Sequence, residues 1–557
     1  MERVVVVAGA AGGGRWQRVD AAGVPTSDAR PAADLAATIA ALEAAEHPLW
    51  IWPDTTRIYP DVLRAGTRVD RARDLAMTEA VLEGYAGRWG SPRSLGAAWL
   101  RARGEQPPDD AAPELPEGAE LTQEALFAEQ DRSSLPPEVD PLAAAVAVYA
   151  EQRRRIAAAG PDERVYEPAP VTPARLDLLA ATDSAAALVG VEMGRTGVPW
   201  DSEVHDRLLV DALGPRPHRG ERPRELQRLA ERIAERLDAP GLNPDSPLAL
   251  TAALRRAGIE IESTRKWELS KVEHPAMEPL LRYKELARLW TATGWAWRDA
   301  WVRRGRLRPE YVPAGVVSGR WATRGGGALQ IPRSLRAAVR ADPGFSLVVA
   351  DAGQLEPRIL AAVSGDPGMM RAAAAPDLYA QLAAESFDGD RRLAKIGLLA
   401  AMYGGSSPAL QTLRNRYPVA LDLLETAART GEAGGLVRTL LGRTCPPGSP
   451  SVDVRRARDR GRFTRNFVIQ GSAADWANAL LAFLRHDLAA IDGSPELVFF
   501  QHDEVIVHAP SAAAGAVVAA VGSAAARASR LMFGTTAVKI PLEATVAADY
   551  AAAKPSV

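Results

Sequence analysis

The chain has 557 residues, of which 47% are hydrophobic and 24% charged, with a formal net charge of −2 and one cysteine. This length exceeds what one hydrophobic core supports, so we expect several domains of ordinary globular composition. The single Cys445 excludes an internal disulfide and cysteine-rich zinc sites and fits a reducing cytoplasm, and no apolar run reaches the roughly 20 residues of a membrane span.

The first 100 residues alternate short apolar strands with alanine-rich helical segments, which predicts a small α/β domain. Residues 4–7 and 49–52 are its clearest strands. The glycine-rich stretch 9–14 has no Gly-Lys-Ser/Thr after it, so we interpret it as a turn. Residues 104–141 are rich in Pro, Glu and Asp, which predicts an exposed connection around one short helix.

The middle of the chain is mostly helical by pattern, and strand patterns return after residue 306. The expected helices are 142–159, 172–193, 225–237, 247–257 and 276–301. The expected strands are 314–317, 347–350, 497–500 and 505–508. A helical block at 367–441 interrupts these strands, so we expect an antiparallel sheet with a helical insertion.

Two predicted strands each end in an aspartate. Asp351 follows the apolar run 347–350, and Asp503 lies in the polar tip 501–504 of a predicted hairpin. Alone, such an aspartate is more often a helix cap or a turn residue. Together, two strand-end aspartates can hold two divalent ions about 4 Å apart, an arrangement that activates a 3′-hydroxyl and steadies a leaving pyrophosphate.

The segment 391–404 is a good helix sequence in which Arg391, Lys395, Leu399 and Tyr403 recur every four residues. On a helix they form one stripe roughly 18 Å long. Two cations followed by an apolar and an aromatic side chain suit a triphosphate, a sugar and a base. The alternative interpretation is a solvated basic face that ends in a core tyrosine. Lys395 favours the first, because only six of the 67 Lys and Arg residues are lysines.

These three stretches, in this order and spacing, resemble the A, B and C motifs of the DNA polymerase I family (family A). The resemblance extends from about residue 180 to the C-terminus. It also covers residues 243–247, 282–289, 318–320, 329–332 and 462–475. It implies template-directed DNA synthesis from dNTPs on primer-template DNA, with release of pyrophosphate, in DNA repair or replication.

The implied fold is a multidomain α/β fold. A right-hand polymerase, with an antiparallel palm sheet and helical fingers and thumb, would follow a small ribonuclease-H-like α/β domain. The expected domains are 1–170 (degenerate 3′-5′ exonuclease-like), 171–305 (thumb), 306–366 (palm), 367–441 (fingers) and 442–557 (palm).

The resemblance also implies site residues, position by position. The implied catalytic residues are Asp351, Asp503, Glu504 and Lys395. Two Mg²⁺ ions, with Mn²⁺ as a substitute, would bind Asp351, Asp503 and the backbone carbonyl of Ala352. The implied nucleotide-binding residues are Arg391, Lys395, Leu399, Tyr403, Gln354, Tyr379 and Glu356, the last as a steric gate against a ribose 2′-hydroxyl. The implied DNA-binding residues are Arg320, Gln330, Arg462, Asn466, Gln470 and His502.

The sequence departs from the family pattern at several of these positions. Ala352 stands where tyrosine is common, and Pro357 follows the gate directly. Leu399 occupies a position that is usually aromatic, and Tyr379 falls where a phosphate-contacting histidine is expected. We therefore predict reduced or altered fidelity.

The N-terminal region matches the place of a proofreading exonuclease without its carboxylates. The first strand carries no Asp-x-Glu, and residues 144–149 show no Tyr-x-x-x-Asp. Asp54, Asp61 and Asp74 do not assemble into a metal site from the sequence. We predict an inactive domain that serves as a structural platform, and we expect no 5′-nuclease domain before it.

Two other functions remain open. A single-subunit RNA polymerase would share the metal aspartates, but Glu356 argues against it because an RNA-making site needs room at the 2′ position. A non-catalytic DNA-binding or scaffold protein is the other alternative, and the presence of Asp351, Asp503 and Lys395 argues against it. We expect a monomer with no membrane partner, in the bacterial cytoplasm.

Overall fold

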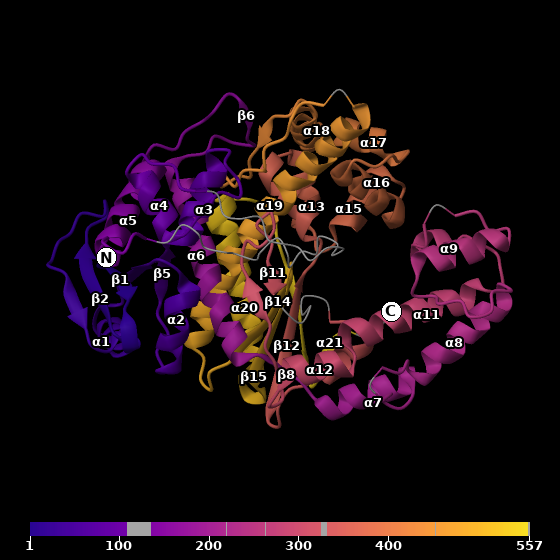
Figure 1. The fold of residues 1–557 in the computed structure, drawn as a ribbon. Coiled ribbons are helices and arrows are strands. Elements are labelled where there is room, and N and C mark those ends of the chain that lie inside the picture. Colours follow the sequence, from indigo (N-terminus) through magenta and orange to yellow (C-terminus); the bar gives the residue numbers. More distant parts are fainter. Residues whose placement is uncertain (109–134, 219, 262, 325–330, 452, 555–557) are drawn as a thin grey trace. The chain divides into compact units, whose positions relative to one another are not determined.

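The structure is a computed structural model, and it describes residues 1–108, 135–218, 220–261, 263–324, 331–451 and 453–554 (Figure 1). The chain divides into two compact units. Unit 1 consists of Met1–Thr196, Glu310–Arg324 and Val348–Val546, and unit 2 consists of Gly197–Pro309, Gly325–Leu347 and Ala547–Val557. The finer division predicted from the sequence, into thumb, palm and fingers, stays a prediction.

Unit 1 begins with a five-stranded sheet in the order β3-β2-β1-β4-β5. Its strands are β1 (Arg3–Ala8), β2 (Gly14–Val19), β3 (Arg30–Ala32), β4 (Leu49–Trp52) and β5 (Arg71–Asp74). β2 runs antiparallel to β1, whereas β4 and β5 run parallel to it. This is the strand order of a ribonuclease-H-like sheet, as predicted.

Helices cover both faces of this sheet, which explains why β1 is apolar at four consecutive positions. Val4 and Val6 belong to one buried cluster, and Val5 and Val7 belong to another. The helices are α1 (Leu35–Glu46), α2 (Thr55–Arg64), α3 (Leu75–Tyr85), α4 (Leu95–Ala102) and α5 (Pro141–Ala157).

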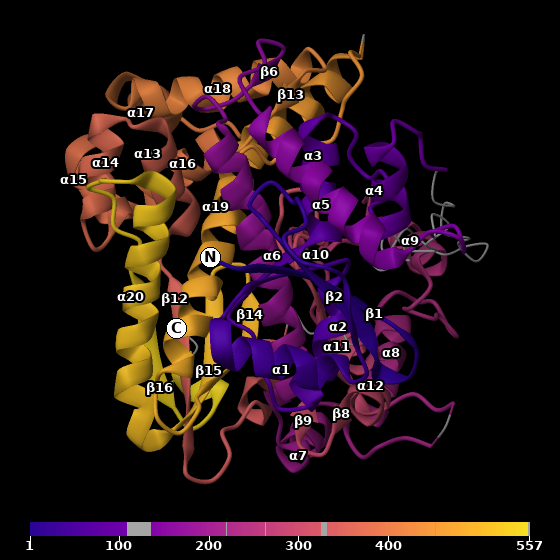
Figure 2. The same ribbon diagram turned by 90° about the vertical axis from the view of Figure 1, so that its left-hand side faces the viewer.

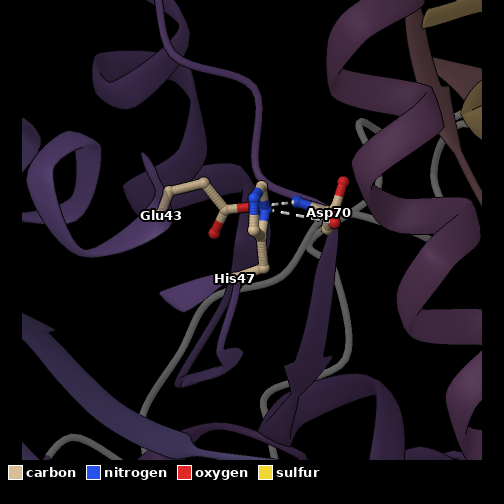
Figure 3. Close-up of side chains that lie close together, drawn as sticks. All are labelled: Glu43, His47 and Asp70. Atoms are coloured by element: carbon tan, nitrogen blue, oxygen red, sulfur yellow. Dashed lines mark hydrogen bonds and ion pairs between the residues drawn. The ribbon is translucent and has the colours of Figure 1, made fainter. Parts of the chain in front are cut away.

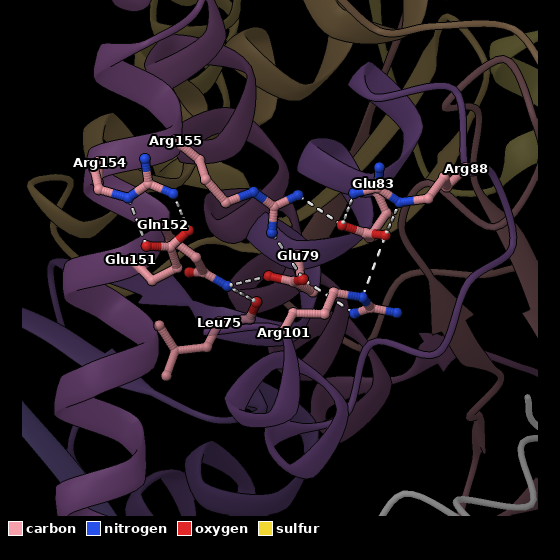
Figure 4. Close-up of polar contacts among 9 residues, drawn as sticks. All are labelled: Leu75, Glu79, Glu83, Arg88, Arg101, Glu151, Gln152, Arg154 and Arg155. Carbon is pink, nitrogen blue, oxygen red and sulfur yellow. Dashed lines mark hydrogen bonds and ion pairs between the residues drawn. The ribbon is translucent and has the colours of Figure 1, made fainter. Parts of the chain in front are cut away.

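Charged side chains join three of these helices (Figure 4). The buried carboxylate of Glu79 on α3 accepts hydrogen bonds from Arg101 of α4 and Arg155 of α5, each at 3.0 Å. Arg155 also donates to Glu83 at 2.6 Å. The α3, α4 and α5 segments are thereby held together by buried ion pairs, each of which would be costly to break singly.

A second sheet of unit 1, in the order β14-β15-β12-β16, carries the predicted strand-end aspartates. Its strands are β12 (Phe345–Ala352), β14 (Glu496–Gln501), β15 (Glu504–Pro510) and β16 (Leu542–Ala547). Nearby helices are α6 (Pro173–Thr196), α19 (Val454–Ala489) and α20 (Ala514–Phe533). α19 packs against α6 and α20 (Figures 1 and 2).

The helical block of unit 1 follows β12. Its helices are α13 (Leu355–Ser364), α14 (Pro367–Ala374), α15 (Leu378–Ser386), α16 (Arg391–Tyr403), α17 (Ala409–Arg416) and α18 (Pro418–Glu432). The buried carboxylate of Asp366 caps two of them, because it accepts from Gly368 and Met369 at the start of α14 and from Val419 and Ala420 at the start of α18. The short β13 (Leu436–Val437) then pairs parallel with β6 (Val165–Tyr166).

Unit 2 is mainly helical and has its own small sheet. Its helices are α7 (Ser202–Leu213), α8 (Arg224–Arg236), α9 (Pro247–Arg256), α10 (Lys266–Leu269), α11 (Met277–Thr293), α12 (Trp295–Trp301) and α21 (Tyr550–Ala553). Its sheet, in the order β7-β9-β8, contains β7 (Val198–Pro199), β8 (Val302–Arg303) and β9 (Arg306–Leu307).

Two sequence predictions were wrong. The helix expected over 276–301 is two helices, because the extended backbone of Gly294 ends α11 and a Cβ there would overlap the carbonyl of Trp290. The strand expected at 314–317 is a turn, in which Ala314 adopts φ 52° and the Gly319 N–H donates to the Val316 carbonyl. The flanking residues form the hairpin of β10 (Glu310–Val312) and β11 (Ala322–Arg324) instead.

Two described helical segments, Val454–Ala489 and Ser511–Phe533, are long and apolar enough to cross a membrane by length and composition alone. In their most apolar windows, 83% and 44% of residues are buried within the protein. Core helices of globular proteins pass the same test, so these two segments are weak evidence for a membrane span.

Candidate functional site

The site begins where β12 and β15 meet. β14 and β15 form an antiparallel hairpin in which Gln501 pairs with Glu504, so His502 and Asp503 are its two turn residues. His502 takes the left-handed conformation that such a turn requires, with φ 57°. The Ala352 N–H donates to the Asp503 carbonyl at 2.9 Å. Residues 351 and 503 therefore lie at the same end of neighbouring strands.

The chain turns sharply after β12. Gln354 takes a left-handed conformation, with φ 59°, immediately before α13 begins. Its side-chain carbonyl accepts from the Leu378 N–H at 2.8 Å, and its amide donates to Asp377 at 2.8 Å. Gln354 therefore links the end of the strand to the start of α15.

Glu356, in the first turn of α13, joins three segments of the chain. Arg320 forms an ion pair with Oε1 of Glu356, and the Tyr403 hydroxyl donates to Oε2 at 2.5 Å. Gln470 of α19 lies near the same hydroxyl and lowers its pKa slightly. Three residues predicted for nucleotide or DNA binding, Arg320, Glu356 and Tyr403, thus form one hydrogen-bonded chain.

The electrostatics of this cluster keep its members in defined protonation states. Burial and the hydrogen bond to Glu356 raise the pKa of Tyr403 to about 12, so Tyr403 is a neutral donor at pH 7. Burial lowers the pKa of His502, and nearby Arg320 lowers it further. His502 is therefore predominantly uncharged at neutral pH.

Two cations of α16, Arg391 and Lys395, lie near the ring of Tyr379. The Arg391 guanidinium lies 5.8 Å from the centre of the Tyr379 ring, and the Lys395 ammonium lies 6.0 Å from it. Both cations belong to exposed residues of the predicted stripe. Arg391 also donates to Asp377 at 2.7 Å. Burial alone would raise the pKa of Asp377, but Arg391 and the N-cap hydrogen bond from Ala380 hold it below its ordinary value.

The DNA-binding residues predicted on α19 lie beside the end of α16. A Cβ at Gly404 would lie 2.7 Å from Cγ of Arg462, and Gly404 ends α16 with φ 72°, so both the space and the backbone favour glycine there. Arg462 forms an ion pair with Asp459. One turn further, Asn466 has a buried side-chain oxygen without a hydrogen-bond partner among the described residues.

A buried ion network lies next to Gly319, the residue before Arg320. Gly319 has φ 81°, and a Cβ there would overlap the Arg443 guanidinium. That guanidinium donates to Asp475 at 2.8 Å and to Asp183 at 2.7 Å. The glycine before Arg320 is therefore required by a cation that α6 and α19 hold in place.

The remaining predicted residues have simple placements. Leu399 is half-buried on α16, and Glu504 is buried at the start of β15. Gln330 lies outside the described residues.

The N-terminal sheet of unit 1 places Asp54 and Asp74 near each other as helix caps. Asp54 accepts from the Thr56 N–H, and buried Asp74 accepts from Thr55 and Met77. Burial raises the pKa of Asp74 to about 6, and Asp54 adds to this effect. Asp61 forms an ion pair with Arg64 in the same helix.

On α5, Arg153 stands four residues after the buried Tyr149, where an exonuclease motif would have an aspartate. Arg153 donates to Asp177 at 2.6 Å.

Sequence reasoning missed two residues that shape the site. Asp377 precedes α15 and was recognisable only as a helix cap, yet it also binds Gln354 and Arg391. Arg358 is fully buried and donates to the carbonyls of residues 353, 373, 375, 376 and 539. No local pattern distinguishes such an arginine from a surface one.

A family model described as DNA polymerase family A matches residues 218–552. DNA polymerase I of Chloroflexus aurantiacus is 27% identical over 288 residues, covering 46% of this chain and 30% of the relative. The thermostable DNA polymerase I of Thermus aquaticus is 28% identical over 325 residues, covering 52% of this chain and 38% of the relative. The matches thus span only 30% to 38% of the length of these relatives.

Among solved structures, the chain is similar to the POL domain of Pol1 from M. smegmatis, solved in complex with DNA primer-template and dNTP. The TM-score is 0.71 at 19% sequence identity, and the match covers 99% of this chain and 95% of that one. This likeness concerns the fold, and it confirms the fold class predicted from the sequence.

Proposed function

The chain belongs to DNA polymerase family A, and from that membership we propose that it extends a DNA primer on a template strand. In each step the primer 3′-oxygen loses its proton and bonds to the α-phosphorus of a dNTP, and pyrophosphate leaves as the α–β phosphoanhydride breaks. The observation that carries the proposal is the meeting of β12 and β15, which brings Asp351 and Asp503 to the same end of two hydrogen-bonded strands.

Family A DNA polymerases use divalent metal ions. The donor set fits hard cations, because carboxylate and carbonyl oxygens are the ligands that Mg²⁺ prefers. We propose that Asp351, Asp503 and the Ala352 carbonyl hold two Mg²⁺ ions, with Mn²⁺ as a substitute. When bound, such ions would acidify the 3′-hydroxyl and offset charge on the phosphates. Glu504, buried beside Asp503, would help to fix the hairpin that carries it.

The α16 cations would bind the incoming triphosphate. Lys395 and Arg391 lie on the same exposed stripe, at 6.0 and 5.8 Å from the centre of the Tyr379 ring. Because Arg391 is paired with Asp377, it would exchange this carboxylate for phosphate oxygens on nucleotide binding. Asp377 would therefore position Arg391 and oppose its capture of the triphosphate.

Glu356 would act as the steric gate against ribonucleotides. A gate residue must be held rigidly to discriminate one hydroxyl group, and Arg320 and Tyr403 hold its two carboxylate oxygens. The proposed 2′-hydroxyl contact would lie on this restrained carboxylate. Gln354 would fix the turn that precedes it, and Leu399 would line the side of the nucleotide site.

Primer and template would run past Arg320, Arg462, Asn466, Gln470 and His502. Their guanidinium, amide and imidazole groups suit minor-groove acceptors that every base pair presents, so binding would test pair geometry and not sequence. Arginine contacts to phosphates would make the affinity fall steeply with salt.

We also propose that the exonuclease-like domain is inactive and that the protein works as a monomer in the bacterial cytoplasm, in DNA repair or replication. Its relatives come from bacteria. Ala352, Leu399 and Tyr379 would alter fidelity, and single-nucleotide misincorporation at ordinary rates would contradict that part of the proposal.

The test is extension of a labelled primer-template with Mg²⁺ and dNTPs by the wild type, Asp351→Ala and Asp503→Ala. Asp34→Ala, which removes an exposed cap of α1, is the control. We expect extension by the wild type and the control, and none by either palm variant. Tight DNA binding without extension would support the non-catalytic alternative, and a preference for rNTPs would support an RNA polymerase. Primer shortening without dNTPs that persists in both palm variants would refute the inactive exonuclease.

A further inference from the structure

Three potential metal ligands meet at the edge of the N-terminal sheet, far along the chain from the polymerase motifs (Figure 3). Glu43 lies in the last turn of α1, His47 ends that helix with φ 45°, and Asp70 precedes β5. The imidazole Nδ1 lies 3.6 Å from Oε1 of Glu43 and 3.3 Å from Oδ2 of Asp70. The ligand atoms of all three side chains lie within 4.8 Å of one another.

The charges of this cluster are unbalanced. Two carboxylates converge on one imidazole, and within the described part of the chain neither carboxylate pairs with a lysine or an arginine. Elsewhere in unit 1, buried carboxylates such as Glu79, Glu83 and Glu192 are paired with arginine. Glu43 is only 5% exposed, yet the imidazole of His47 is its one ion-pair partner among the described residues, which is unusual for a buried carboxylate.

Glu43 is held in place by hydrogen bonds from two neutral N–H groups. Its Oε2 accepts from the indole N–H of buried Trp50 at 2.6 Å, and its Oε1 accepts from the Asp70 N–H at 2.7 Å. The Asp70 carbonyl in turn accepts from Arg485 of α19 at 2.9 Å. Hydrogen bonds to a ligating carboxylate and to the backbone of its neighbour are the outer contacts that orient metal ligands.

The separations match those of a coordination sphere. Bonds of about 2.0–2.2 Å at angles of 90–110° place neighbouring ligand atoms about 3.0–3.5 Å apart. The two measured separations, 3.3 and 3.6 Å, lie at or near this range. The His47 side chain is 58% exposed, so water could reach the remaining coordination positions.

We propose that Glu43, His47 and Asp70 bind a first-row divalent transition-metal ion, of which Zn²⁺ is the best suited. An imidazole with two carboxylates favours such an ion over Mg²⁺ and Ca²⁺, which prefer oxygen ligands only. The ion supplies the missing positive charge and ties the end of α1 to the entry of β5. Its role is structural, and it is independent of the proposed polymerase activity.

The test is a calorimetric titration of the full chain with Zn²⁺ at pH 7.5. The chain carries Asp351→Asn and Asp503→Asn, which removes the proposed palm ligands. We expect one saturable site that becomes at least 100-fold weaker with His47→Ala. The matched control is His486→Ala, because His486 is also exposed and its Nδ1 lies 3.6 Å from a single carboxylate, that of Asp487.

Two further measurements keep the test decisive. Asp70→Asn keeps the size of the side chain and the backbone carbonyl that Arg485 binds. Like His47→Ala, it should weaken Zn²⁺ binding. Co²⁺ bound to the same chain should show visible absorption that the His47→Ala variant lacks. The proposal would be overturned if the parent chain with Asp351→Asn and Asp503→Asn bound Zn²⁺ no more tightly than its His47→Ala and Asp70→Asn variants, or if it bound no Zn²⁺ at millimolar concentration. Either result would leave only an imidazole between two carboxylates.

Discussion

Arg485 offers a sharp test of how the N-terminal sheet is attached to the long helix α19. Its guanidinium donates to both oxygens of Glu192, at 2.7 to 3.0 Å, and to the Tyr59 hydroxyl at 3.1 Å. It also donates to the carbonyls of Val69 and Asp70, which directly precede β5. One arginine of α19 thus binds α6, α2 and the entry to β5.

The substitution Arg485→Met keeps the length of the side chain and removes its charge. The Arg485 side chain is 9% exposed and that of Glu192 is 14% exposed, so solvent screens the pair little. Removing one partner of a buried ion pair costs about 3–5 kcal/mol. Arg68 and Tyr59 would still contact Glu192, so we expect a loss near the lower end, about 3 kcal/mol.

The assay is native-state hydrogen exchange, which reports the free energy of local opening. Amides of α2 and β5 should lose about 3 kcal/mol of protection in Arg485→Met. Arg527→Met is the control. Arg527 of α20 pairs with Asp487, which lies on α19 like Arg485, but the Arg527 side chain is 38% exposed. This substitution should therefore lower the free energy of opening by about 1 kcal/mol or less. Equal losses in the two variants would refute the reasoning.

A double variant isolates the interaction. If the cost of Arg485→Met is mainly the stranded charge of Glu192, then Glu192→Met combined with Arg485→Met should cost less than the sum of the single substitutions. Strict additivity would show that the two side chains act independently. Primer extension should be unaffected, because Arg485 lies 15 residues, about 22 Å, along α19 from Gln470.

The same pair predicts a pH dependence. Burial alone would raise the pKa of Glu192, but Arg485 and Arg68 outweigh it and hold the pKa below its ordinary value. The folded state therefore gains stability from this carboxylate above the unfolded-state pKa, and it loses that stability as the pH falls through the folded-state pKa. The stability difference between the wild type and Arg485→Met should accordingly shrink in acid.

Three further substitutions test other contacts. Asp366→Ala should lower protection of both α14 and α18 by about 2–4 kcal/mol in hydrogen exchange, because one carboxylate caps both helices; an effect on α14 alone would contradict the shared cap. Gly319→Ala should reduce primer extension at least tenfold by displacing Arg443 and Arg320, whereas Gly365→Ala, which has φ 65° but open space around it, should not. Asp377→Asn should lower the KM for dNTPs by up to about fivefold, because the pair that it breaks with Arg391 is exposed and weak; an increased KM would show that Asp377 chiefly positions the arginine.

Local sequence patterns determined much of the secondary structure. The strand at 49–52 and the hairpin around 502–503 are where the apolar runs and polar tip predicted them. The helices that begin at 141 and 247 start with a capping Asp or Ser followed by proline, a signal that acts within a few residues. The motif spacing was also enough to identify the family, because the chemistry demands particular residue types at the ends of particular elements.

Only the tertiary structure decided which of these residues touch. Arg320, Glu356 and Tyr403 are up to 83 residues apart in the chain, and their hydrogen bonds depend on how α13, α16 and the segment that carries Arg320 pack. The pairing of Arg391 with Asp377 and the meeting of His47 with Asp70 have the same origin. Periodicity and capping act over a few residues, whereas ion pairs and ligand clusters form between side chains that only the folded chain brings within 4 Å.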